Sequence, residues 1–250
     1  MTSLRERLKA GRPLIVAHAG ASACAPENTM AAFNLALEQG ADSIELDVNL
    51  SSDLVPVVIH DHTLDRTTDG KGLVGERSLA ELKQLDAGRW FGDSFAGERI
   101  PSLEEVLRWA KGRVPLHIEI KNNPIRYPDI ASKIVGTLEQ VDMMEEVEVF
   151  SFDHTVVRDV KRMCPGLATG VCYAADPVDH LVLARLAEAN ALHPHWATLR
   201  KEVVADAHRE GLFVAVWTVN DPQVARLMAQ WKVDGIATDA PDKLRSALER

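Results

Sequence analysis

An acidic pair lies inside an apolar stretch in the first fifth of the chain. The segment from Ser43 to Val48 reads SIELDV and alternates apolar with polar residues, which predicts a β-strand. Alternate side chains of a strand point to the same face, so Glu45 and Asp47 would lie side by side. Two adjacent carboxylates repel each other and lose hydration on burial, and a divalent cation relieves both costs. The pair therefore indicates a metal site, although a solvated edge strand would show the same alternation.

A second predicted strand also carries charged residues on one face. The segment from Val114 to Lys121 reads VPLHIEIK and places His117, Glu119 and Lys121 on that face. Glu119 would add a third oxygen ligand to the acidic pair, and hard oxygen ligands suit Mg²⁺ or Ca²⁺. A charged lysine cannot ligate a metal, but Lys121 can hold a phosphate oxygen.

Two histidines and a tryptophan follow apolar runs at predicted strand ends. His18 comes after LIVA, and His60 comes after VPVVI. An imidazole titrates at about pH 6.5, so the two side chains could serve as general acid and general base near neutral pH. Trp217 is either core packing or an aromatic wall against a substrate. The other histidines are interpreted as satisfied core residues, namely His62, His117, His154, His180, His193, His195 and His208.

The elements that must position these residues alternate along the chain, which predicts an α/β fold. Helical segments separate nine candidate strands, namely Leu14–Ala17, Ser43–Val48, Val55–Ile59, Val114–Lys121, Val147–Phe152, Ala168–Tyr173, Ala191–His193, Phe213–Val219 and Gly235–Thr238. This length and alternation favour a (β/α)8 TIM barrel, in which the candidate site residues fall at the carboxyl ends of the strands, where barrel enzymes carry their sites. An eight-stranded barrel has no place for one of the nine candidates. The surplus strand is either one of the two on either side of Leu54 or the one at Ala191.

One long segment does not follow the alternation. Residues 62–100 are rich in glycine and contain a single short helical piece, from Ser78 to Leu85. The segment is too long for an ordinary loop. We expect residues 1–250 to form a single TIM-barrel domain, with an insertion after the third strand at about 62–100 that lies over one end of the barrel.

Composition narrows the classes of partner and compartment. The formal net charge is −9, and nucleic-acid contacts need clustered Lys and Arg, so we expect no nucleic-acid partner. A phosphate substrate remains compatible, because a metal inverts the local field. Three cysteines lack metal-site spacing and favour a reducing compartment. The chain shows no signal-peptide pattern and no run of about 18 apolar residues, so we expect a soluble cytoplasmic protein without stable membrane insertion.

Several runs together resemble the glycerophosphodiester phosphodiesterase family. They are AHAGASACAPENTMAAF, IELDVNLSSDLVPVVIHDHTLDRTTDGKG, RIPSLEEVL, HIEIK, VNDP with Trp217 ahead of it, and VDGIATDAPD, in the family's order from Ile15 to Leu244. The resemblance implies a barrel that cleaves glycerophosphodiesters to glycerol 3-phosphate and an alcohol with Mg²⁺ or Ca²⁺. It implies that His18 and His60 are the acid/base pair, and that the segment after His60 helps cover the glycerol end of the substrate. It further implies that Glu45, Asp47 and Glu119 are metal ligands and that Lys121 contacts the phosphate.

One position departs from the family's pattern. The first motif of the family is His-Arg-Gly, with the arginine on the substrate phosphate, whereas this chain has His18-Ala19-Gly20. Loss of a charged fork weakens phosphate binding unless another cation replaces it, and Lys121, Arg66 and Arg89 are the candidates.

Three functions remain open on the sequence. They are a metal-dependent glycerophosphodiesterase, a phospholipase D-like lyase on the same barrel, and an impaired family member that binds phosphodiesters without turnover. The sequence leaves the preferred head group, the physiological metal and the oligomeric state open.

Overall fold

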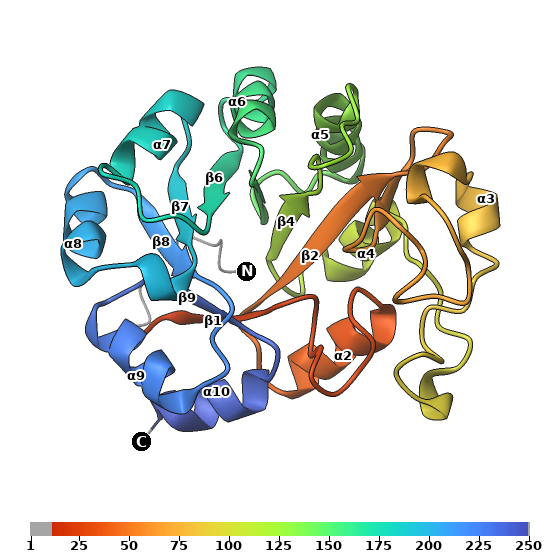
Figure 1. Cartoon of the computed structure of the whole chain (residues 1–250), viewed down its shortest axis with the longest axis horizontal. Helices are drawn as coiled ribbons and strands as arrows, with labels where there is room; N and C mark the ends of the chain where they lie inside the picture. Colours follow the sequence, from red (N-terminus) through yellow and green to blue (C-terminus); the bar gives the residue numbers. More distant parts are fainter. Residues whose placement is uncertain (1–11, 250) are drawn as a thin grey trace.

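The computed structural model describes residues 12–249. Eight parallel strands form a ring that closes because β1 pairs with both β2 and β9. The barrel strands are β1 (Leu14–Ala17), β2 (Ser43–Leu50), β4 (Leu116–Ile120), β5 (Val147–Ser151), β6 (Ala168–Tyr173), β7 (Ala191–Pro194), β8 (Phe213–Val216) and β9 (Gly235–Thr238). Helices surround the ring in Figure 1, so the predicted TIM barrel is confirmed.

The helices begin where the sequence offers capping residues. Thr29 caps α2 by accepting a hydrogen bond from the Ala32 amide, and Ser102 forms a capping box with Glu105 at the start of α4. The helices around the barrel are α2 (Met30–Glu38), α4 (Leu103–Ala110), α5 (Ile130–Val141), α6 (His154–Met163), α7 (Leu181–Ala187), α8 (Lys201–Arg209), α9 (Pro222–Gln230) and α10 (Pro241–Leu248). A short 3₁₀ helix, η4 (Trp196–Thr198), follows β7.

The third strand in chain order is the surplus candidate. β3 (Pro56–Val58) pairs antiparallel with β2 and takes no part in the barrel ring, whereas the segment at Ala191 is the barrel strand β7. Only residues 51–55 join β2 to β3, and a parallel crossover needs a dozen or more residues, so a hairpin was the only available connection. The prediction that His60 ends a barrel strand is therefore wrong. The hairpin returns the chain toward the middle of β2, where the Ile59 amide donates to the Asp47 carbonyl.

The segment 62–100 is built from short pieces around its own small apolar cluster. It contains η2 (Val74–Glu76), α3 (Leu79–Leu82) and η3 (Asp93–Phe95). Leu64, Val74 and Leu82 are fully buried there against residues of β3. In Figure 1 this yellow and orange part lies beside the barrel, next to α2 and α4.

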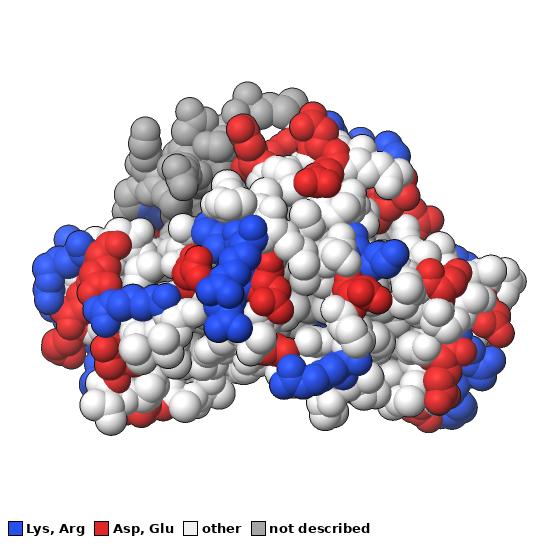
Figure 2. All heavy atoms as spheres, turned by 90° about the horizontal axis from the view of Figure 1, so that it is seen from above, with Lys and Arg blue, Asp and Glu red and all other residues white. Residues whose placement is uncertain are grey.

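The two faces of β2 have opposite characters. Ile44, Leu46 and Val48 are fully buried in one cluster with residues of α2 and α4, such as Phe33 and Leu103. The alternating positions of β2 therefore face the inside of the barrel. The outer surface is charged, and Lys or Arg side chains are interspersed with Asp or Glu on the face seen in Figure 2. Within residues 12–249, every helix is too short or too polar to cross a membrane.

Candidate active site

Three carboxylates meet inside the barrel. Glu45 and Asp47 project from β2, and Asp47 is in register with Glu119 of β4. One oxygen from each carboxylate lies within 4.8 Å of the others, and all three residues are at most 8% exposed. The alternation of β2 and the adjacency of β4 thus produce the cluster that the sequence predicted.

The carboxylate cluster has oxygen atoms without hydrogen-bond partners. Glu45 Oε1 and Asp47 Oδ1 are buried and accept no hydrogen bond among the described residues. Lys121 Nζ lies 2.7 Å from Glu119 Oε1 and 3.1 Å from Asp47 Oδ1, the latter as an ion pair without hydrogen-bond geometry. A buried carboxylate oxygen that accepts no hydrogen bond is costly, so this cluster fits a bound divalent cation.

The charges of this cluster respond to burial in different ways. Burial and the neighbouring Asp47 raise the pKa of Glu45 to about 8, and burial also raises the pKa of Glu119. Burial alone would raise the pKa of Asp47, but the positive charge of Lys121 outweighs this effect and lowers the pKa of Asp47 to about 2. Lys121 loses hydration, but Asp47 and Glu119 raise its pKa far above the ordinary value. The metal-free site therefore holds a proton that a cation would displace.

His18 is held by a carboxylate from the far end of the chain. Its Nδ1 lies 2.8 Å from Asp239 Oδ1, because β1 and β9 are neighbours and the His18 amide bonds to the Thr238 carbonyl. Burial alone would lower the pKa of His18, but the bond to Asp239 and the charges of Glu45 and Asp47 raise it to about 9. These neighbours favour the protonated form of His18 in the metal-free site. Asp239 was not among the predicted site residues, although it directly follows the predicted strand Gly235–Thr238.

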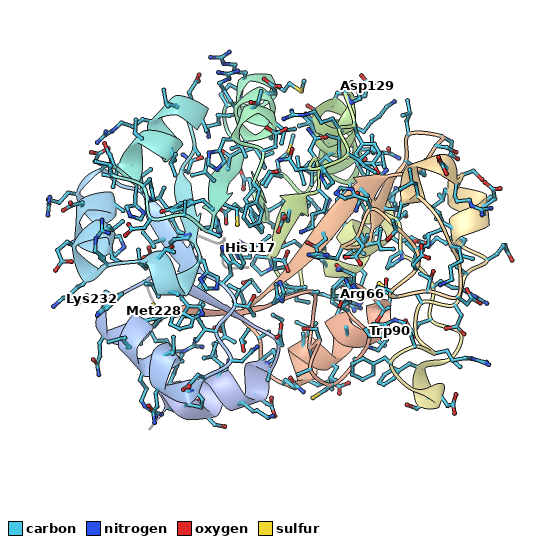
Figure 3. The ribbon with its side chains drawn as sticks, in the orientation of Figure 1. Arg66, Trp90, His117, Asp129, Met228 and Lys232 are labelled. Carbon is cyan, nitrogen blue, oxygen red and sulfur yellow. The ribbon has the colours of Figure 1, made fainter. Side chains whose placement is uncertain are left out.

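His60 is held in a similar way by the residue that follows it. Its Nδ1 lies 2.6 Å from Asp61 Oδ1. Arg66 donates to the same Asp61 and, through its other two nitrogens, to Glu27. Hydrogen bonding to Arg66 lowers the pKa of Asp61 to about 2, so Asp61 stays ionised and orients the His60 ring. Figure 3 shows Arg66, which belongs to the segment 62–100, near α2.

The turn after β1 binds the acidic cluster through its backbone. Ala19 has a φ of 53° and donates its amide to Glu45 Oε2 at 2.8 Å. The side-chain oxygen of Asn28 accepts a hydrogen bond from the backbone amide of Asp47. The side-chain NH₂ of Asn28 donates to Asp47 Oδ2 at 2.8 Å. These bonds orient two of the carboxylates, and no pattern in the sequence had indicated Asn28.

All of the candidate residues except Asp47 line one cavity of about 90 Å³. His18, Glu45, His60, Glu119, Lys121 and Trp217 all line it. Trp217 directly follows β8, donates its indole N–H to the His193 carbonyl and meets the exposed Phe152 ring edge to face. It therefore forms an aromatic wall of the cavity while also being anchored to the barrel.

A fourth carboxylate inside the barrel lies at the level of Glu45, because His117 of β4 is in register with both Glu45 and Glu148. Glu148 of β5 is 2% exposed and bonds to His117 at 2.7 Å and to His193 at 2.9 Å. The two histidines lower the pKa of Glu148 despite its burial. Figure 3 shows His117 at the centre of the barrel. Of the seven histidines predicted to be satisfied core residues, His117, His180 and His193 are buried and bonded, as predicted. The prediction is wrong for the others, because His62, His154 and His195 are only partly buried and His208 lies exposed on α8 beside Asp234.

The fold and the site together define a class of protein. The chain is a TIM barrel in which two histidines, two of three converging carboxylates and a partly buried lysine line one cavity, and barrel enzymes carry their sites at the strand ends. Residues 18–243 match the Glycerophosphoryl diester phosphodiesterase family, and the chain belongs to that family.

Relatives agree with this assignment. The chain is 43% identical over 234 residues to a glycerophosphodiester phosphodiesterase of Caldanaerobacter subterraneus, covering 93% of this chain and 96% of the relative. Among solved structures, a glycerophosphodiester phosphodiesterase from Agrobacterium tumefaciens has a TM-score of 0.84 at 36% identity, covering 94% of this chain and 99% of the other. An Oleispira antarctica phosphodiesterase in complex with the product sn-glycerol-3-phosphate has a TM-score of 0.87 at 32% identity, covering 97% and 99%.

Proposed function

We propose that this enzyme hydrolyses glycerophosphodiesters to glycerol 3-phosphate and an alcohol, with a divalent cation and two histidines. One observation carries the proposal, namely that His18 and His60, each bonded to an aspartate, line the same cavity as Glu45 and Glu119 of the three-carboxylate cluster. The Oleispira relative with bound sn-glycerol-3-phosphate supports the substrate class.

The acidic cluster supplies the cation site of this proposal. Glu45, Asp47 and Glu119 would hold Mg²⁺ or Ca²⁺, since all their ligand atoms are hard oxygens. The ion would neutralise charge on the phosphate oxygens, which otherwise repels an incoming nucleophile. Lys121 would contact a phosphate oxygen from the same wall of the cavity.

The two histidines take different parts because their environments differ. His18, held protonated by Asp239, is suited to give a proton to the leaving alkoxide. His60, oriented by Asp61, is suited to take the proton of the attacking hydroxyl. We propose that this hydroxyl belongs to the glycerol itself, so that a cyclic phosphodiester forms and water then opens it. Trp217 would pack against the substrate as one wall of the cavity.

The test is turnover of glycerophosphocholine with Mg²⁺ or Ca²⁺, followed by ³¹P NMR. Release of glycerol 3-phosphate supports hydrolysis, a cyclic end product indicates a lyase, and binding without product indicates an inactive binder. His18→Ala and His60→Ala should each lower turnover by roughly 10²–10⁴-fold, the usual effect of losing a positioned acid or base.

A control variant and a control substrate distinguish loss of a catalytic group from a general structural effect of the substitution. His208→Ala is a matched control, because His208 also bonds to a carboxylate, Asp234 at 2.9 Å, but lies outside the cavity. It should keep near-native turnover. A diester without the vicinal hydroxyl should be a poor substrate, and its rapid cleavage would contradict attack by the glycerol hydroxyl.

A further inference from the structure

A second pocket opens beside Ala19. Its volume is about 460 Å³, and His18, Ala19, His60, Arg66, Asp239 and Lys243 are among the residues on its wall. His18 and His60 border both this pocket and the cavity of about 90 Å³ described above. A phosphate between the two histidines would therefore have some oxygens facing that cavity and others facing this pocket. The side chain of Ala19 ends at its Cβ, and it contributes neither charge nor a hydrogen bond to the pocket.

The positive charge of Arg66 is paired with two carboxylates. Its Nε bonds to Asp61 at 2.7 Å, and its two terminal nitrogens bond to Glu27 at 2.8 and 2.7 Å. These two carboxylates compensate the guanidinium, and a substrate anion would have to break their bonds to reach it. Arg89 is exposed, lies 3.8 Å from Asp86 and does not line this pocket.

Lys243 is different from these arginines. It lies in the first turn of α10, is exposed, and has no carboxylate within 4 Å among residues 12–249. Of the lysine and arginine residues on the pocket wall, it alone has an uncompensated charge among the described residues.

The backbone holds Lys243 close to the turn of Ala19. The Ala23 amide donates to the Asp239 carbonyl at 2.9 Å, and the Asp239 side chain bonds to both His18 and Ser22. The residues from Asp239 to Lys243 are thus attached to the turn that carries Ala19. Lys243 follows Asp239 by four residues, and its flexible stem allows the ammonium to reach inward.

We propose that Lys243 is the phosphate-binding cation on the Ala19 side of the site. It contacts a non-bridging oxygen of the substrate phosphate, opposite to Lys121. This inference rests on the proposed function, because that function puts the phosphate between His18 and His60. A lysine acts as a point charge on a flexible stem, so it attracts the phosphate without the fixed geometry of an arginine fork.

The experiment is a double-mutant cycle between Lys243 and Ala19. Wild type, Lys243→Met, Ala19→Arg and the double variant are titrated calorimetrically with sn-glycerol 3-phosphate in the presence of Mg²⁺. Lys243→Met should weaken binding about tenfold, as expected for loss of a hydrogen bond to a charged group. In the Ala19→Arg background the same change should weaken binding by less than about twofold, because the new arginine fills the pocket with its own positive charge.

Lys201→Met is the matched control. Lys201 is also an exposed lysine in the first turn of a helix, α8, and it lines none of the cavities at the site. Its replacement should leave both binding and thermal unfolding unchanged. Unchanged binding in Lys243→Met, or equal losses in both backgrounds, would overturn the proposal.

Substrates with different head groups test which anion Lys243 contacts. A phosphate contact predicts the same loss of kcat/KM for glycerophosphocholine and glycerophosphoserine, whereas a loss confined to glycerophosphoserine, whose head group carries a carboxylate, would overturn it. The proposed function fails separately, if the wild type binds glycerol 3-phosphate but hydrolyses neither diester. The calorimetric cycle needs no turnover and decides on Lys243 in either case.

Discussion

The proposed metal site leads to a quantitative prediction about the thermal stability of the protein. A ligand that binds only the folded state at about 100 times its Kd stabilises it by about 2.7 kcal/mol. For a chain of 250 residues, an unfolding entropy of about 2.1 cal/mol/K per residue gives about 0.5 kcal/mol per degree. Saturating Mg²⁺ or Ca²⁺ should therefore raise Tm by about 5 °C.

The effect should depend on pH in a defined direction. Folded protein keeps the Glu45 proton up to pH about 8, whereas the unfolded chain releases it near the ordinary value of 4.5. Metal-free stability from this group therefore falls as pH rises through that interval. The cation competes with the proton, so its apparent affinity should rise by about tenfold per pH unit below pH 8 and level off above it. The metal-induced rise in Tm should consequently be larger at pH 8 than at pH 6.

Circular dichroism melts of chelator-treated protein, with and without added metal, measure this effect. Asp47→Asn keeps the shape of the residue and an acceptor for Asn28, but removes one charged ligand. The metal-induced rise should disappear in this variant and persist in Asp93→Asn, which changes an exposed carboxylate in η3. If Asp47→Asn shows the full rise, the cation binds elsewhere and the assignment of the cluster is wrong.

Three further changes test other parts of the structure. Asp239→Asn should lower the pKa of His18 from about 9, because His18 loses its hydrogen-bonded anion. The alkaline limb of the pH–rate profile should therefore move down by roughly one pH unit or more. An unchanged limb would show that His18 is not the general acid. Gly20→Ala should destabilise the protein by about 1–3 kcal/mol in urea unfolding, because Gly20 has a φ of 87° and an added Cβ would lie 2.7 Å from that of Ala32. Glu148→Leu should cost about 3–5 kcal/mol, since it leaves two buried histidines without their shared acceptor, and a native-like Tm would contradict that account.

Local patterns in the sequence determined much of this protein. The alternation in SIELDV and in HIEIK specified which side chains face the barrel interior, and the acidic cluster follows from two adjacent strands. Thr29, Ser78 and Ser102 marked helix starts, because a cap needs only a few neighbouring residues. These features depend on short-range geometry, which the order of residues contains directly.

Tertiary structure decided the features that join distant segments. The sequence did not show that β3 folds back as a hairpin, which brings His60 to the level of Asp47. Asp239 lies 221 residues from His18, and only closure of the barrel makes them partners. Whether Arg66 or Lys243 has a free charge likewise depends on which carboxylates surround each one. Such pairings arise from how the ring of strands closes, and no local pattern in the chain encodes them.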